Sequence, residues 1–345
     1  MPWTKIAVDH ATNELSAESG AENGRLLTYG AALREAQYQA LKRDERVFLM
    51  GEGVDDPGGI FGSTLDLHKD FKGRVFDTPI AENALTGFIN GAALTGSRPI
   101  LVHMRMDFML LSFDQILNHA AKFCYMSGGR VCVPWVVRTL VGRGWGSAAQ
   151  HSQSLHAFFM HMPGVKIVMP SCAYDAKGLL LASIADDNPV VFVEHRWLYD
   201  LKTYVPQDEY LIPLGKGFVR KSGKDATVVA LSLMVSEALK AAESLKKEGI
   251  DIEVIDPRTL HPFDEEIVVE SVKKTGRLVI ADQGWRSGGA AEIIAGRLCN
   301  KIRPYLKSDV GFVTLPDTPT PSSPALEEGF YRNAADIVSC VKGAL

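Results

Sequence analysis

The sequence predicts an α/β protein with two doubly wound domains, each built on a mostly parallel sheet. Short, nearly continuous runs of Val, Ile and Leu alternate with longer amphipathic segments, which is typical of parallel strands covered by helices on both faces. The alternation stops near residue 205 and then starts again. The chain has 345 residues, which is long for one domain and ordinary for two.

In the first half, residues 31–43 have the apolar spacing of a helix, and residues 46–51 form a short buried run typical of a strand. The same alternation continues to residue 194. The further expected helices are 82–94, 114–126, 151–161 and 175–185, and the further expected strands are 99–102, 131–137, 165–169 and 190–194.

A segment of mixed composition, 195–215, follows and contains Pro206 and Pro213. After it we expect strands at 227–233, 251–255, 278–281 and 310–314, and helices at 236–247, 263–274, 290–298 and 334–341. We therefore expect a polar leader at 1–25, a first domain at 26–205 and a second domain at 206–345.

Composition excludes several classes of protein. The net charge of -4 argues against a basic nucleic-acid surface, and no run approaches the roughly 18 apolar residues of a membrane span. The five cysteines are odd in number and no pair has CxxC spacing, which argues against a disulfide framework, a zinc ribbon and an iron–sulfur cluster. The first 25 residues lack the pattern of a signal or transit peptide, so we expect a cytoplasmic protein.

Three polar clusters stand at expected strand-to-helix turns, where open parallel sheets bind ligands. In DTPIAEN (77–83), Glu82 is either functional or simply an acid favoured by the helix dipole. In MRMDF (104–108), the Met and Phe beside a charge are also typical of a core. In GSAAQHSQS (146–154), His151 begins an expected helix, so it is either neutral and structural or placed for chemistry.

At these clusters the sequence resembles the beta subunits of the thiamine-dependent first component of 2-oxoacid dehydrogenases, a family that includes the pyruvate, branched-chain and acetoin enzymes. Transketolase is a more distant relative. The order and spacing of many segments carry the resemblance: GEGVDDPGGIFGST (51–64), RVFDTPIAE (74–82), DFMLLSFDQILNHAAK (107–122), YMSGG (125–129), AAQHSQS (148–154), DAKGLL (175–180), DNPVVFVEH (187–195), IDPRTLHPFD (255–264) and DQGWRSGGAAEI (282–293).

The resemblance implies a pyrimidine-binding, transketolase-like domain followed by a transketolase C-terminal domain, with thiamine diphosphate as cofactor. Glu82 matches the carboxyl that shares a proton with the cofactor's pyrimidine nitrogen, which requires a poorly solvated pocket. Phe108 matches the aromatic that stacks on the pyrimidine, and Met104 matches another wall of the pocket. His151 matches the active-site histidine that contacts intermediates or the acyl acceptor.

Thiamine enzymes hold Mg²⁺ and the diphosphate through a GDG segment, and this sequence contains none. The resemblance therefore implies that a separate alpha chain supplies the diphosphate half of the site and the Mg²⁺ ligands, in a heterotetramer of two alpha and two beta chains. It also implies a potassium site built mostly from backbone carbonyls, at the matching positions Trp135, Ser183, Asp186 and Asn188.

The sequence departs from the family pattern at Arg105 and His103, which leaves the substrate open. A buried Arg105 needs an anion, and that anion is either a carboxyl such as Asp107 or Asp114 or an acidic group of the substrate. Three functions remain: a decarboxylating 2-oxoacid dehydrogenase that passes an acyl group to the lipoyl group of an acyltransferase, a split transketolase or acyloin-forming relative, and a non-catalytic assembly subunit. The presence of Glu82, Phe108 and His151 together argues against the last of these.

Overall fold

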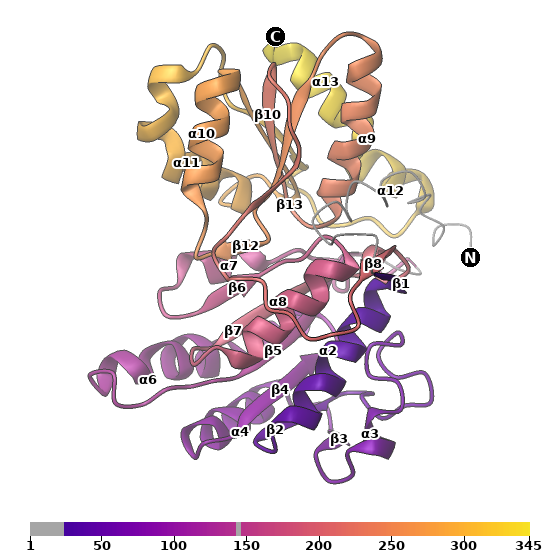
Figure 1. The fold of residues 1–345 in the computed structure, drawn as a ribbon, viewed down its shortest axis with the longest axis vertical. Helices are drawn as coiled ribbons and strands as arrows, with labels where there is room; N and C mark the ends of the chain where they lie inside the picture. Colours follow the sequence, from indigo (N-terminus) through magenta and orange to yellow (C-terminus); the bar gives the residue numbers. More distant parts are fainter. Residues whose placement is uncertain (1–23, 143–145) are drawn as a thin grey trace.

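The structure is a computed structural model that describes residues 24–142 and 146–345, and Figure 1 shows its two stacked α/β layers. Nearly all of the expected leader at 1–25 lies outside the described residues. The first layer holds a seven-stranded sheet with the strand order β12-β6-β7-β5-β4-β2-β3. Its strands are β2 (Val47–Gly51), β3 (Val75–Asp77), β4 (Arg98–His103), β5 (Val136–Val141), β6 (Lys166–Val168), β7 (Val190–His195) and β12 (Thr259–His261).

Helices cover both faces of this sheet. Along β4, Ile100 and Val102 pack into the core beneath α2 (Tyr29–Arg43) and α8 (Ala173–Ala185), whereas Leu101 faces the opposite core. Because both faces are buried, the strands are apolar throughout, as the sequence pattern predicts. The opposite face and the sheet edges carry α3 (Leu67–Asp70), α4 (Glu82–Leu94), α5 (Met106–Met109), a 3-10 turn (Leu110–Ser112), a π-helix (Asp114–Ala120), α6 (Ala121–Met126) and α7 (His156–His161).

The second layer holds a five-stranded sheet with the order β14-β13-β10-β11-β9, in which only β9 is antiparallel to its neighbour. Its strands are β9 (Phe218–Lys221), β10 (Ala226–Ala230), β11 (Ile252–Asp256), β13 (Leu278–Trp285) and β14 (Gly311–Leu315). The accompanying helices are α9 (Leu233–Lys247), α10 (Glu265–Thr275), α11 (Ala290–Ile302), α12 (Pro324–Phe330) and α13 (Ala334–Ala344), with a 3-10 turn at Arg303–Tyr305.

The two layers are tied together by β-pairing as well as by the chain. The strand β12 comes after β11 in the sequence but pairs antiparallel with β6 at the edge of the first sheet. A small ribbon of β1 (Arg25–Thr28) and β8 (Lys202–Val205) closes the end of the first layer, after a 3-10 turn at Arg196–Leu198. The fold class predicted from the sequence is confirmed, and the division at residue 205 stays a prediction.

Three of the expected elements that differ from the structure have a local explanation. The strand expected at 131–137 is β5, which starts only at Val136 because Pro134 has no N–H to donate within a central strand. The helix expected at 151–161 begins at His156, since the backbone N–H groups of Gln153 and Leu155 bond to side chains of α5 instead. The strand expected at 227–233 ends at Ala230, because α9 already begins at Leu233.

Candidate active site

The carboxyl ends of β2, β3, β4 and β5 lie side by side, and the three polar clusters follow three of these strands. Glu82 is the first residue of α4, after β3. Arg105 and Phe108 belong to the start and the interior of α5, after β4. His151 lies in the segment between β5 and α7. The parallel topology therefore gathers the clusters at one edge of the sheet, where ligands bind in folds of this kind.

Glu82 occupies an unusual position for a helix-start acid. Glu82 as a whole residue is only 6% exposed, and among the described residues no donor forms a hydrogen bond with its carboxylate. Its carboxylate oxygens are not among the buried atoms that lack a partner, so they remain accessible to a ligand. An acid in a mostly covered position, with its carboxylate open to a ligand, fits the group that faces the pyrimidine nitrogen of thiamine diphosphate, and this fit supports that cofactor.

Two further acids lie beside Glu82, and sequence reasoning did not single them out. Burial raises the pKa of Glu52, and the negative charges of Glu82 and Asp77 raise it further. Asp77 is oriented by the backbone N–H of Gly53, which donates to its Oδ1 at 2.7 Å. The signal for Glu52 was available, since it is an acid that directly follows the buried strand expected at 46–51.

Phe108 and His151 form a second part of the candidate site. Their ring centroids are 5.1 Å apart with the planes at 74°, so the edge of one ring meets the face of the other. His151 is exposed and Phe108 is 38% exposed, which leaves the aromatic surface open to a ligand. Met104 is partly buried and packs against the apolar core under α2 and α8.

Arg105 has protein partners on two sides. Its Nη2 donates to the backbone carbonyl of Gly142, and its Nε lies 3.8 Å from Oδ2 of Asp107. Burial lowers the pKa of Arg105, and the nearby Asp107 opposes that shift. Asp107 is one of the carboxyls that the sequence analysis considered, so the structure supplies an anion within the protein.

His103 turns out to support α4 from below. It is 1% exposed, and its Nε2 lies 3.1 Å from the hydroxyl of Thr86 and 3.4 Å from that of Ser112. The Thr86 hydroxyl in turn lies 2.8 Å from the backbone carbonyl of Glu82. Burial lowers the pKa of His103 to about 4, so the imidazole is neutral in the folded protein at neutral pH.

This burial predicts a specific loss of stability in acid. The unfolded chain binds a proton at His103 near pH 6.5, whereas the folded chain resists it down to about pH 4. Neutral His103 therefore costs the folded state nothing above pH 6.5. As the pH falls from 6.5 toward 4, the unfolded chain gains a proton at His103 that the folded chain does not, and the free energy of unfolding decreases. Between pH 7 and pH 4.5 we expect the free energy of unfolding to fall by about 2–3 kcal/mol more in the natural protein than in His103→Gln. Denaturant titrations at the two pH values measure this difference, and parallel pH curves for the two proteins would contradict it.

The positions matched to a potassium site are also close together, at the amino-terminal edge of the sheet. The α8 helix ends at Ala185, and carbonyl oxygens at a helix C-terminus carry partial negative charge that attracts cations. The carbonyl of Asp186 accepts from Nη1 of Arg98 at 3.0 Å, and that of Trp135 accepts from the N–H of Val190 at 3.0 Å. Asp186 Oδ1 accepts from the backbone N–H of Asn188 at 2.9 Å, and the carbonyl of Ser183 accepts from Asp186 at 3.3 Å. The guanidinium of Arg98 and the ammonium of Lys166, which pairs with the carboxylate of Asp186, already place positive charge here, so the potassium site stays a prediction.

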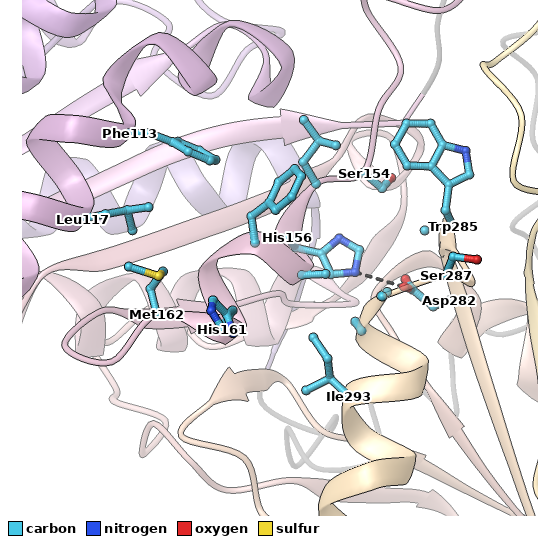
Figure 2. A pocket seen from close by; sticks show the side chains of 17 residues that line it. Phe113, Leu117, Ser154, His156, His161, Met162, Asp282, Trp285, Ser287 and Ile293 are labelled. Atoms are coloured by element: carbon cyan, nitrogen blue, oxygen red, sulfur yellow. Dashed lines mark hydrogen bonds and ion pairs between the residues drawn. The ribbon is translucent and has the colours of Figure 1, made fainter.

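A cavity of about 520 Å³ lies elsewhere, between α7 and the start of α11. Figure 2 shows its mostly apolar wall, with Nε2 of His156 directed at Oδ2 of Asp282, 3.0 Å away. Glu82, Phe108 and His151 are not among its lining residues. The cavity is lined by Ser154 and Leu155, so it adjoins the segment that carries His151 without including the predicted site residues. Within the described ranges, no group of three or more His, Cys, Asp or Glu side chains is arranged to hold a metal, and no helix is both long and apolar enough to cross a bilayer.

Sequence comparisons agree with this geometry. The pyrimidine binding domain of transketolase matches residues 25–202, and the C-terminal domain of transketolase matches residues 215–337. The beta subunit of acetoin:2,6-dichlorophenolindophenol oxidoreductase from Cupriavidus necator is 43% identical, over 92% of this chain and 97% of that protein. The beta subunit of the pyruvate dehydrogenase E1 component from Rhizobium meliloti is 42% identical, over 92% of this chain and 69% of that protein.

A third relative, the 2-oxoisovalerate dehydrogenase subunit beta of Bacillus subtilis, is 39% identical over 92% of this chain and 98% of that protein. Among solved structures, an inactive beta4 tetramer of a split-gene transketolase has the same fold, with a TM-score of 0.73, 24% identity, and coverage of 92% of this chain and 98% of that chain.

The pyrimidine-binding and C-terminal domains together define a protein of the transketolase class. Within that class, the chain belongs to the family of beta subunits of thiamine diphosphate-dependent 2-oxoacid dehydrogenases. The resemblance seen in the sequence is confirmed.

Proposed function

We propose that this chain supplies the pyrimidine half of a thiamine diphosphate site, with Glu82 as the carboxyl that faces the pyrimidine and Phe108 and Met104 as parts of its wall. The observation that carries the proposal is Glu82 itself: the residue is mostly covered, its carboxylate stays accessible and has no donor among the described residues, and it lies at the ligand-binding edge of the sheet. Thiamine diphosphate, when bound, would supply the nucleophilic chemistry needed to decarboxylate a 2-oxoacid. Glu82 would hydrogen-bond the pyrimidine nitrogen, and His151 would contact the substrate or the acyl acceptor.

An alpha chain completes the site in this proposal. The segments next to Glu82 carry exposed apolar side chains: Ile80, two residues before it, is 79% exposed, Phe88 on α4 is 55% exposed, and Leu111, in the 3-10 turn after α5, is 63% exposed. Clustered exposed apolar side chains are typical of a protein–protein interface. The alpha chain covers them and brings the diphosphate and Mg²⁺ ligands, in an assembly of two alpha and two beta chains in the cytoplasm. A potassium ion binds at the carbonyls of Trp135, Ser183, Asp186 and Asn188.

Activity in the assembled complex tests this function. The chain is produced together with an alpha chain, thiamine diphosphate and Mg²⁺, and is offered pyruvate, branched-chain 2-oxoacids and acetoin with an artificial electron acceptor. We expect substrate-dependent reduction of the acceptor, followed by acyl transfer when a lipoyl domain is added. Formation of C–C bonds without reduction would favour the split transketolase or acyloin-forming alternative. No turnover with any substrate, despite assembly, would favour an assembly subunit and overturn the proposal.

A further inference from the structure

The segment 146–155, which carries His151, contains no helix or strand of its own. Segments of this kind adopt one conformation only where specific contacts hold them. Three consecutive residues at the start of α5, directly before Phe108, contact this segment or the end of the strand before it. They are Arg105, Met106 and Asp107.

Asp107 makes the most direct of these contacts. Its Oδ1 accepts from the backbone N–H of Gln153 at 3.1 Å and from the side-chain Nε2 of the same residue at 2.9 Å. Gln153 is two residues after His151, so this carboxylate fixes the backbone next to the histidine. The Asp107 side chain is 2% exposed, and hydrogen bonds to a charged acceptor are roughly twice as strong as neutral ones.

The neighbours of Asp107 extend the attachment. The Sδ of Met106 accepts from the N–H of Leu155 at 3.2 Å, at the end of the segment. Arg105 donates to the carbonyl of Gly142, directly after β5, and its Nε lies 3.8 Å from Asp107 Oδ2. Phe108, next in sequence, meets the ring of His151 at 5.1 Å. One short helix therefore presents the aromatic ring and also fixes the backbone on both sides of the histidine segment.

We infer that Asp107, backed by Arg105, is a positioning residue that holds His151 against Phe108 in the active site. The inference rests on the proposed function, because it assigns His151 a part in turnover. It also assigns Arg105 a role as a partner of Asp107 and Gly142 rather than as a reader of substrate. The hydrogen bonds that attach the segment 146–155 to α5 can be measured on this chain alone, without an activity assay.

Hydrogen exchange of the full-length chain, followed by mass spectrometry, tests the attachment. In Asp107→Ala we expect exchange of the segment 150–156 to become about 10-fold faster, because a hydrogen bond to a charged acceptor is removed from the N–H of Gln153. In the control Asp114→Ala, whose exposed carboxylate bonds to Asn118 within its own helical segment, the segment keeps its exchange rate. Unchanged exchange in Asp107→Ala would overturn the inference.

A double-mutant cycle in the complex with the alpha chain tests positioning against a merely structural role. We expect Asp107→Ala to lower kcat by about 10- to 100-fold in the natural background. In the His151→Ala background it should have little effect, because Asp107 acts on kcat only by positioning His151. Equal losses in both backgrounds would show a structural role and overturn the inference. If His151→Ala alone has full activity, the proposed role of His151 fails, while the exchange experiment still reports on the attachment.

The variant Arg105→Met tests the assignment of Arg105. A raised KM for acidic substrates, with unchanged exchange of the segment, would show that Arg105 reads substrate and would contradict that assignment.

Discussion

Glu82→Gln, assembled with its alpha chain, is expected to lose about 10²–10⁴-fold in activity, the range typical for removal of a catalytic acid or base. The amide has nearly the same size and still fits the first turn of α4, so the fold and the assembly are expected to persist. It cannot, however, share an acidic proton with the pyrimidine nitrogen. Steady-state kinetics of the complex measure the loss, and sedimentation of the same sample measures assembly.

A helix-start acid of another helix provides the matched control. Glu266 lies in the first turn of α10 and is exposed, so Glu266→Gln changes only a weak interaction with the helix dipole. We expect full activity for this control. A Glu82→Gln variant that assembles fully and keeps more than about half of the natural rate would lack the loss expected for a catalytic group. Glu82 would then be only a helix-start acid.

Arg220→Met is expected to cause the largest loss of stability. Arg220 on β9 is fully buried and pairs with Asp175 of α8 and, at 2.9 Å, with Asp256 of β11, so it joins the two layers. Both carboxylates are themselves 0% exposed. Removing the guanidinium leaves them buried without their main counter-charge, which typically costs about 3–5 kcal/mol. Denaturant unfolding at pH 8 measures the loss.

The loss is expected to depend on pH. Burial raises the pKa of Asp175, and Arg220 opposes this rise, so the variant should bind a proton at Asp175 more readily than the unfolded chain does. A folded pKa above the unfolded value favours the folded state as the pH falls, so the variant regains part of its stability in mild acid. The neighbouring Lys221→Met is the control: its partner Asp251 is 38% exposed, and the expected loss is below about 1 kcal/mol. A loss in Arg220→Met no greater than in this control would contradict the account.

Much of the edge that carries the site could be predicted from local pattern. The helix expected at 82–94 has the same bounds as α4, because its apolar spacing is regular and the preceding turn contains Pro79. Glu82 at its start, and Phe108 after the next strand, could therefore be placed at the ligand-binding edge before the structure was known. The parallel topology, which brings these strand ends together, followed from the alternation of apolar runs and helices.

Features that depend on contacts distant in sequence could not be predicted. Gln153 bonds to Asp107, 46 positions away, and the expected start of a helix is instead a segment without regular secondary structure. In β5, the charge of Arg138 hides the apolar pattern of the strand. Its guanidinium is buried because Glu194 on the neighbouring β7 pairs with it and the side chains of Gln37 and Ser63 accept its remaining hydrogen bonds. The strand β12 follows a strand of the second sheet in the sequence but pairs with the first sheet where the two layers meet, and no local pattern indicates that.

The central claim is that this chain holds half of a thiamine diphosphate site. Calorimetry with thiamine diphosphate and Mg²⁺ tests it most directly, first on the purified chain and then on the chain combined with an alpha chain. The account predicts no binding tighter than about 1 μM by the chain alone, and binding tighter than that once the alpha chain is present. Sub-micromolar binding by the chain alone would contradict it.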